Sequence, residues 1–480
     1  MKILFIQPQG TGLPPLGLMY VGASLKQNGY NDISLVDLKE DSDSPMRKRE
    51  YLEKMLDKKP DVIGISATTP SFKEAIQIAR IAREHTPMLI IGGPHATIFQ
   101  EQLLQKYPFI DAVVYGEGEI TAVEFMNNIE NLKGVKGVIY RENGKIIKNE
   151  PRPRIENLDS LPFPDRTLID MNAYHGAFSI MTSRGCPHQC TFCCSPVTGK
   201  IFRYRNPKNV VDEIEFLVNS YPKLVERGLQ IAVSDECFNT NIQRAKDICD
   251  EIVRRNLKVA LSFQNGLHVR TVDLELFQKM KTAGCNNIWF GIESGNEKVL
   301  KDLKKGITKG MVRNAVKLAR EAGIERIAGH FMLGLPGDTK ETAMDTINFM
   351  KELRLNYAGF NQTAPLPNTE LWEYVKKNGH FLFKYEDIED YEKFRMSNTE
   401  PQFETPEFTA KERVEIYDIA IHELDSVIRS QYLNMKSVKK IFKRVRTFDD
   451  MKWLVKYVYV LFFGKDIRRL LPQRTIKKNE

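Results

Sequence analysis

The chain has 480 residues, of which 42% are hydrophobic and 28% are charged. These values are typical of a folded protein of about three domains, and they exclude a disordered, collagen-like or membrane-bundle chain. The formal net charge is +8, but residues 436–480 hold 14 Lys and Arg against 4 Asp and Glu, so the remaining residues are close to neutral. The positive charge is confined to the tail, and no nucleic-acid partner is expected.

The start of the chain and the tail bear on its location. The first apolar run, residues 3–6, ends at Gln7 and is too short for a signal peptide. No stretch reaches the roughly 18 apolar residues of a spanning helix, so we expect a cytoplasmic protein. In the tail, apolar residues between 453 and 462 form a stripe flanked by Lys and Arg. This pattern predicts either peripheral membrane contact through an interfacial helix or packing of the stripe on the rest of the chain.

Residues 1–150 alternate short apolar runs with helical patterns. Strands are expected at residues 2–7, 33–38, 61–67, 88–93 and 112–116, and helices at 16–28, 49–58, 72–85 and 98–106. This alternation predicts a doubly wound, flavodoxin-like (Rossmann-like) α/β domain. Its ligand crevice should lie at the carboxyl ends of the strands.

A second alternating series follows a proline-rich linker at residues 151–172. Strands are expected at 178–183, 230–234, 260–264, 287–292, 326–333 and 357–363, with helices at 210–219, 242–255, 274–283, 311–322 and 342–353. Six such units over residues 173–385 predict a partial (βα)6 barrel. The last part, residues 386–480, is expected to be helical and basic.

Three cysteines, Cys186, Cys190 and Cys193, follow the first predicted barrel strand in a CxxxCxxC pattern. Three thiolates on one loop can bind three irons of a [4Fe-4S] cluster and leave the fourth iron open. The alternatives are a zinc site completed by His188 or Cys194, or cysteines that only pack in the core. Zinc sites usually need a second cysteine pair, which is absent, so the pattern favours the cluster.

The other cysteines and one loop motif have simpler interpretations. Cys237, Cys249 and Cys285 lie in predicted strand ends or helices, where free cysteine behaves as a small buried apolar residue. The loop at residues 10–15 is not a GxGxxG motif, because two prolines replace the glycine that opens the helix. Nicotinamide binding is therefore disfavoured.

Residues 182–193 resemble the cysteine loop of the radical S-adenosylmethionine (SAM) superfamily, in the subgroup with an N-terminal cobalamin-binding domain. The resemblance implies that the open iron binds the amino and carboxylate groups of SAM. It also implies reductive cleavage of SAM to a 5′-deoxyadenosyl radical, with electrons from a donor such as flavodoxin or ferredoxin. The SAM contacts that it implies are Phe192, Asp235, Glu236, Arg270, Glu293, Ser294 and Gly334.

The strand-end loops of residues 1–150 resemble the cobalamin-binding domain of that subgroup. Glycines let backbone amides approach a bulky ligand, and hydroxyl groups can hydrogen-bond its tail. The implied cobalamin contacts are Pro14, Leu16, Gly17, Ser66, Thr68, Thr69, Gly92, Gly93, His95, Gly116 and Glu117. The alternative is that these glycines only form turns in a flavodoxin-like sheet.

The segment after Asp37 departs from one cobalamin-binding pattern. It lacks the histidine of the DxHxxG motif, which coordinates cobalt from below in other methyl-transfer domains. We therefore expect no imidazole at the lower cobalt face from this position. His95 is the nearest other candidate, and we interpret it as a hydrogen-bonded loop residue rather than a ligand.

These features together predict a radical SAM enzyme that uses a [4Fe-4S] cluster and cobalamin. The expected reaction is methylation of an unactivated carbon or phosphorus centre of a small-molecule or lipid-like substrate. The alternative is radical cyclisation or rearrangement without net methyl transfer. An RNA methylthiotransferase is disfavoured because residues 1–185 contain no cysteine for a second cluster. A sensor without catalysis would leave Asp235, Glu236 and Glu293 without a role.

Overall fold

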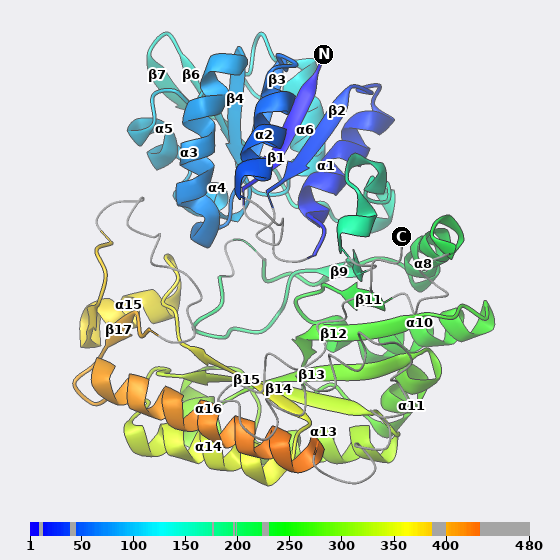
Figure 1. The fold of residues 1–480 in the computed structure, drawn as a ribbon, viewed down its shortest axis with the longest axis vertical. Helices are drawn as coiled ribbons and strands as arrows, with labels where there is room; N and C mark the ends of the chain where they lie inside the picture. The colour runs from blue at the N-terminus through cyan, green and yellow to red at the C-terminus, as the bar shows by residue number, and fades with distance from the viewer. Residues whose placement is uncertain are drawn as a thin grey trace.

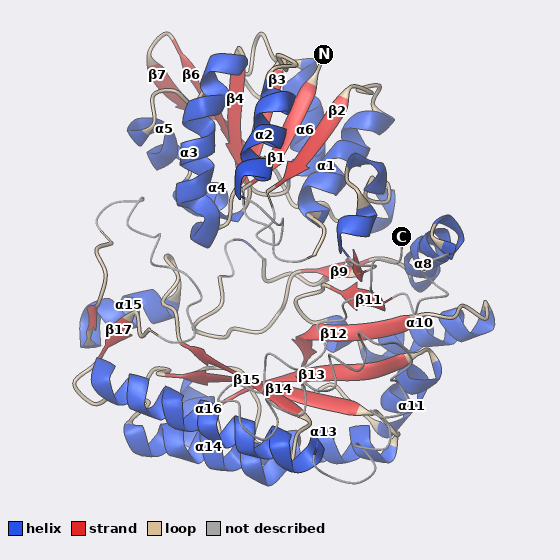
Figure 2. Cartoon of the chain, in the orientation of Figure 1, coloured by secondary structure: helices blue, strands red, loops and turns tan. Residues whose placement is uncertain are grey.

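The protein contains two α/β domains, one above the other in Figure 1. The computed structural model describes residues 1–8, 13–38, 45–174, 177–194, 197, 199–222, 230–385 and 400–432. Each domain is built on a largely parallel sheet, and helices are interspersed along the chain (Figure 2). This architecture confirms the predicted fold class.

The N-terminal sheet has the strand order β2-β1-β3-β4-β5-β6-β7. Five strands run parallel, namely β1 (Ile3–Gln7), β2 (Ile33–Asp37), β3 (Val62–Ser66), β4 (Met88–Gly92) and β5 (Ala112–Val114). All five were predicted from their apolar runs. An antiparallel hairpin of β6 (Val138–Glu142) and β7 (Lys145–Lys148) was not predicted. Its turn, Asn143-Gly144, has positive φ at both residues, which is a typical hairpin signal.

The helices of this domain cover both faces of the sheet. They are α1 (Leu16–Gln27), α2 (Pro45–Leu56), α3 (Phe72–Ala82), α4 (Pro94–Phe99), α5 (Glu101–Lys106) and α6 (Gly118–Asn127). Successive residues of β1 enter different cores: Phe5 packs with α1 and α6, and Ile6 packs with α2 and α3. The single helix predicted at 98–106 is wrong, because Gln100 has a φ of 48° and separates α4 from α5.

The linker segment is ordered and packed between the domains. Short helical turns occur at Leu158–Ser160, Arg166–Leu168 and Met171–Tyr174. Ile155 is buried, and Leu168 lies so close to Gly22 of α1 that a Cβ on this glycine would stand 2.4 Å from its side chain. The linker therefore helps to position one domain against the other.

The second sheet has six parallel strands in the order β15-β14-β13-β12-β11-β8. They are β8 (Ala177–Ile180), β11 (Gln230–Val233), β12 (Ala260–Leu267), β13 (Cys285–Glu293), β14 (Arg326–Leu333) and β15 (Tyr357–Gln362). The order follows the chain, as the partial barrel requires. A small antiparallel pair, β9 (Ser183–Arg184) and β10 (Arg203–Tyr204), stands beside this sheet.

Helices pack on the outer face of the second sheet. They include α8 (Pro207–Ser220), α10 (Ile242–Arg254), α11 (Leu274–Thr282), α12 (Glu297–Asp302), α13 (Lys309–Glu321) and α14 (Lys340–Leu353). Each begins after a side chain that accepts a hydrogen bond from the first turn: Asn206, Asn241, Asp273, Asn296, Thr308 and Thr339. Such caps satisfy amide groups that have no partner within the helix.

The C-terminal part adds α15 (Glu370–Asn378), β16 (His380–Phe381), β17 (Phe403–Glu404) and α16 (Ala410–Tyr432). Helix α16 crosses the bottom of the molecule in Figure 1 beside α14. The predicted interfacial stripe of the tail lies outside the described residues. Within the described residues, no helix is long and apolar enough to span a bilayer.

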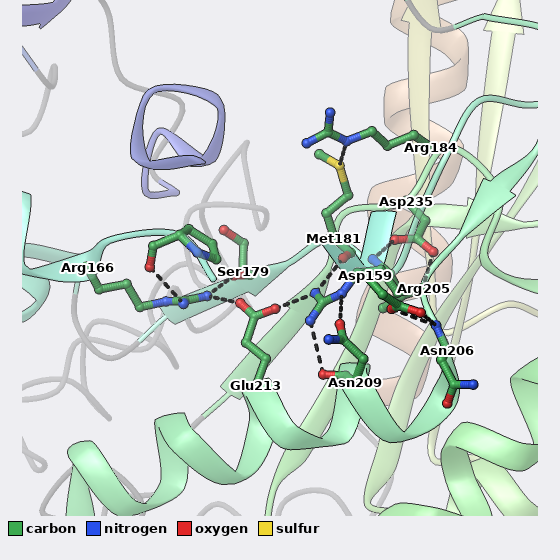
Figure 3. A network of polar contacts seen from close by, with 12 residues as sticks. Asp159, Arg166, Ser179, Met181, Arg184, Arg205, Asn206, Asn209, Glu213 and Asp235 are labelled. Carbon is green, nitrogen blue, oxygen red and sulfur yellow. Dashed lines mark hydrogen bonds and ion pairs between the residues drawn. The ribbon is translucent and has the colours of Figure 1, made fainter. Parts of the chain in front are cut away.

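A fully buried carboxylate ties the linker to the barrel (Figure 3). Glu213 of α8 accepts from Arg166 at 2.6 Å through one oxygen and from Arg205 through the other. Arg166 also donates to the Ser179 carbonyl at 3.0 Å, and Arg205 to the Met181 carbonyl at 3.0 Å. One charge therefore holds the linker, the first barrel strand and the first barrel helix together.

We predict that Glu213→Gln lowers the free energy of unfolding by about 3–5 kcal/mol, because two buried guanidinium groups lose their counter-charge. Urea denaturation followed by circular dichroism measures the change. Glu215→Gln on the same helix is the matched control, since Glu215 pairs with Arg255 at the surface and its loss should cost at most about 1 kcal/mol. Equal losses in the two variants would contradict the prediction.

Candidate active site

One cavity of about 330 Å³ lies between the two domains. Its N-terminal walls come from the ends of β1, β3, β4 and β5 and from helices α1 and α6. Its remaining wall comes from linker residue Arg154 and, beside the cysteine loop, from Met181, Arg184, Val197 and Glu236. The crevice predicted at the carboxyl ends of the N-terminal strands therefore exists, and the second domain closes it.

Glycines make room along the cavity wall. A Cβ on Gly17 or on Gly116 would have no heavy atom within 4 Å, so side chains at these positions would project into open space. Gly93 has a φ of 92°, and a Cβ there would come within 2.7 Å of the Ser66 hydroxyl. The wall is thus built for close approach of a large ligand to the backbone.

The structure brings some of the expected cobalamin contacts together and not others. Six of them line the cavity: Gly17, Ser66, Gly92, Gly93, Gly116 and Glu117. Pro14, Leu16, Thr68, Thr69 and His95 are not among its lining residues. Thr68 instead caps the short turn that follows it, where its hydroxyl lies 3.0 Å from that of Ser71.

His95 belongs to the core of the N-terminal domain. It is fully buried, stacks on Phe72 with ring centres 3.8 Å apart, and contacts Phe99 on its other side at 4.3 Å. Its Nδ1 lies 3.3 Å from the Thr69 hydroxyl, and burial lowers its pKa to about 3. The imidazole is neutral and held away from the cavity, so this geometry gives no support to a cobalamin contact.

A cluster of buried ion pairs joins the domains at the cavity wall. Glu117 accepts two hydrogen bonds from Arg203 of β10, at 2.8 and 3.0 Å. Glu119 pairs with Arg184 of β9 at 2.5 Å, and the same guanidinium lies over the Tyr20 ring. Although burial alone would lower it, the charges of Glu119 and Glu117 raise the pKa of Arg184. Arg184 is therefore a permanent cation two residues before Cys186.

The cysteine loop is anchored by segments that are distant in sequence. The Cys186 amide donates to the Gly199 carbonyl at 3.0 Å, and the Thr191 amide to the Leu303 carbonyl at 3.2 Å. The Thr191 carbonyl accepts from the Leu371 amide of α15 at 3.0 Å. The loop is thus bound by the barrel on one side and by the C-terminal part on the other.

The three cysteines are half-buried on this loop. A hydrogen bond with Cys237 raises the pKa of the Cys186 thiol, so Cys237 is not only a core residue as predicted. Cys249 and Cys285 do pack in the barrel core. Among the described residues, no three His, Cys, Asp or Glu side chains stand in a geometry that could hold a metal ion. The loop fits a cluster by its donor types and its anchoring, not by preassembled geometry.

Two adjacent acidic residues at the end of β11 have different environments. Asp235 is buried and accepts from the Thr182 amide and the Ser183 hydroxyl, each at 2.6 Å. Its carboxylate is thus engaged in holding the start of the cysteine loop. Glu236 lines the cavity and accepts an amide hydrogen bond from Gly185 at 3.2 Å, while burial raises its pKa. Only Glu236 faces the space where a ligand can lie.

Buried Lys305, which the sequence analysis did not identify, lies beside Glu293, one of the expected SAM contacts. Glu293, at a φ of 67°, pairs with Lys305 at 2.5 Å, and both side chains are 9% exposed. Ser294 is turned away toward α14, where its hydroxyl lies 3.2 Å from that of Thr346. Arg270 is exposed on the neighbouring loop. Only the burial of Lys305 distinguishes it from Lys304 beside it.

The turn after β14 is fixed from the C-terminal helix. Gly334 has a φ of 82°, and its amide donates to the Asp338 carboxylate at 3.0 Å. Arg413 of α16 is fully buried between the Phe403 and Phe408 rings and donates to the Gly334 carbonyl at 3.2 Å. Buried Arg413, about 80 residues downstream, thus shapes the turn at Gly334. No local sequence motif predicts this contact.

Phe192 of the cysteine loop packs close to that turn. It contacts one apolar cluster formed by Val299, Leu303 and Leu335, and a second one that includes Leu371. The structure therefore brings Phe192 and the turn at Gly334, two of the expected SAM contacts, close together.

Comparisons with known proteins match both domains. Residues 5–126 match the B12 binding domain, and residues 180–350 match the radical SAM superfamily. An uncharacterized methyltransferase from Pyrococcus horikoshii is 36% identical over 404 residues, which is 80% of this chain and 84% of that protein. The anaerobic magnesium-protoporphyrin IX monomethyl ester cyclase of Cereibacter sphaeroides is 30% identical, covering 78% of this chain and 64% of that protein.

Two solved structures share the fold over most of the chain. The radical SAM methyltransferase TsrM from Kitasatospora setae, with cobalamin and a [4Fe-4S] cluster bound, has a TM-score of 0.70 at 19% identity and covers 90% of this chain and 92% of its own. The cobalamin-dependent radical enzyme OxsB, with aqua-cobalamin and SAM bound, has a TM-score of 0.71 at 18% identity and covers 96% of this chain and 71% of its own. At these identities the likeness shows the fold alone.

We predict that replacing Cys186, Cys190 or Cys193 by Ala removes the iron that anaerobic reconstitution introduces, about four atoms per wild-type chain, because each loss leaves two thiolates on the loop. Iron and sulfide analysis measures the content. Cys194→Ala is the matched control within the same loop and should keep its iron. Reconstituted wild type that holds zinc and no iron, or a Cys194 variant that loses as much iron, would contradict the prediction.

Proposed function

The chain belongs to the radical SAM superfamily, in the group that carries a B12-binding domain, and from this premise we propose that it is a methyltransferase acting on a small molecule. Its cofactors are S-adenosyl-L-methionine, a [4Fe-4S] cluster and cobalamin. One observation carries the proposal. Arg184 and Glu236, which adjoin the cysteine loop, line the same cavity as the strand ends of the B12-binding domain.

The lining of the cavity suits cobalamin in its chemistry. Its lining is mainly apolar, glycines open its wall at Gly17 and Gly116, and its charged side chains stand at the domain boundary. Among the described residues, no histidine lines the cavity. The Asp37 carboxylate accepts a hydrogen bond from the Tyr174 hydroxyl. We propose that cobalamin binds here with no imidazole at its lower face. When bound, it supplies the methyl group.

The residues around the cysteine loop have matching roles in the proposal. Cys186, Cys190 and Cys193 hold the cluster, and Glu236 receives the ammonium group of SAM in a charge-assisted hydrogen bond. Asp235 acts on the loop and not on SAM, because Thr182 and Ser183 occupy its carboxylate. Lys305 holds the Glu293 carboxylate in place, and Phe192 and the turn at Gly334 flank the adenine.

Methyl transfer is favoured over ring formation by the comparisons. The methyltransferase relative is more similar than the cyclase relative and covers a larger share of its own length, 84% against 64%. The acceptor would be an unactivated carbon or a phosphorus atom. An electron donor such as flavodoxin or ferredoxin would reduce the cluster.

Contact of the basic tail with anionic lipid stays a separate prediction, which flotation with acidic vesicles at low salt tests.

The reaction itself is tested with SAM that carries a deuterated methyl group. We expect the reduced holoenzyme to release 5′-deoxyadenosine and to transfer the labelled methyl group to a component of a metabolite pool, detected by mass spectrometry. Accumulation of 5′-deoxyadenosine with no labelled product would reject methyl transfer and favour the cyclase alternative. Absence of SAM cleavage would reject both.

We predict that Gly17→Leu weakens cobalamin binding by about tenfold or more, because the new side chain projects into the open cavity. Gly17 has an ordinary helical backbone conformation, so the change strains no turn. The measurement is the absorbance of cobalamin retained through gel filtration after reconstitution with hydroxocobalamin. Gly17→Ala, which adds one methyl group at the same point, is the control and should retain the cofactor. Full retention by the Leu variant would place cobalamin elsewhere.

A further inference from the structure

The inner face of the barrel sheet has a partly aromatic surface. Along β13 and β14, alternate residues such as Ile288, Phe290 and Phe331 enter the core beneath the helices. The residues between them, Trp289 and His330, therefore point to the opposite face. The helices α13, α14 and α16 lie below the sheet in Figure 1, and the N-terminal domain lies above it.

The part of the chain that the structure describes does not fully cover this face. Gln264 and Asn265 of the central strand β12 are exposed, and Trp289, His330 and Asn361 are only half-buried. Strands whose two faces were both packed would bury all of these side chains. Within the described residues, the inner face is thus partly exposed.

Three rings form one platform on this face. Trp289 stacks on His330 with centres 4.5 Å apart and meets Tyr357 of β15 edge-on at 5.4 Å. Gly266 and Gly359 lie beside these rings, and a Cβ on either would stand in ordinary van der Waals contact with the His330 ring, at 3.7 and 3.6 Å. We call Trp289, His330 and Tyr357 the inner platform.

The hydrogen bond of His330 determines which nitrogen can meet a ligand. Its Nε2 lies 2.7 Å from the Gln264 carbonyl oxygen, which can only accept, so Nε2 carries the proton. In the neutral ring Nδ1 is then an acceptor. None of the described residues donates a hydrogen bond to Nδ1. The platform therefore offers an apolar ring surface with one free acceptor.

The side chains around the platform are mostly neutral. Inner-face neighbours such as Gln264, Asn265, Asn287 and Asn361 are neutral amides. The nearest charges on β13, Glu293 and its partner Lys305, neutralise each other. Arg326, at the start of β14, has the same strand parity as His330 and is an exception to these neutral neighbours. A lipid chain would leave His330 Nδ1 without a donor.

We propose that the inner platform binds the planar, uncharged, conjugated ring of the substrate, with His330 Nδ1 accepting a hydrogen bond from a ring N–H or O–H group. The proposal rests on the proposed function only in taking the barrel as the place of reaction. It narrows the substrate class from small molecules in general to ring systems with a donor at the edge, and it excludes a lipid-like chain at this position.

The test measures binding of three probes to the holoenzyme loaded with cluster, SAM and cobalamin. The probes are indole, 1-methylindole, which has the same plane without a donor, and decanol, which has a hydroxyl donor on an apolar chain but no planar ring. We expect indole to bind about fivefold more tightly than 1-methylindole, because one hydrogen bond separates them. In His330→Phe, which keeps a ring on Trp289, this preference should vanish. His422→Phe, an exposed histidine on α16, is the matched control and should keep it.

Trp289→Leu provides a second variant, which should weaken indole and 1-methylindole alike by removing the stacking surface. Decanol that binds as tightly as indole, or an indole preference that survives in His330→Phe, overturns the inference. Cobalamin retention and SAM cleavage, measured on the same variants, distinguish failure of the inner-platform proposal from failure of the methyltransferase proposal. Intact cofactors without indole preference reject the platform alone, whereas indole preference without any methyl transfer rejects only the methyltransferase proposal.

Discussion

The buried ion pairs between the domains are the constraint on which the rest of the site depends. Glu117 and Glu119 follow the last parallel strand of one domain, and Arg184 and Arg203 stand on the small hairpin of the other. Charges taken out of water are tolerated only when partners lie in good geometry, so separating the domains here would leave several of them uncompensated. These interdomain ion pairs therefore set the distance between the cavity and the cysteine loop.

The same constraint explains the glycine between Arg184 and Cys186. Gly185 has a φ of 85°, and a Cβ there would lie 2.2 Å from the Ile201 carbonyl oxygen. The chain must turn sharply at Gly185, because Arg184 before it is held by the N-terminal domain and Cys186 after it begins the cysteine loop. Domain contact and cofactor loop are thus parts of one short segment.

Much of the fold could be predicted because its signals are local. Apolar runs identified every parallel strand, and apolar periodicity placed most of the helices that pack on the sheets. The errors are also local in origin: the hairpin at Asn143-Gly144 carried a turn signal that was not used, and the positive φ of Gln100 divided an expected helix. Neither error affects the position of the cavity, since strand order alone places the strand ends together.

Fewer features of the candidate site than of the fold could be predicted from the sequence. The spacing of Cys186, Cys190 and Cys193 by itself determined a loop with three thiolates, because spacing within eight residues is a property of the chain. Which of two adjacent carboxylates, Asp235 or Glu236, faces the cavity depends on hydrogen bonds from another strand. The roles of buried Lys305 and Arg413, and of the inner platform, arise likewise from contacts between residues far apart in sequence. Burial and orientation depend on packing, and packing is decided only by the tertiary structure.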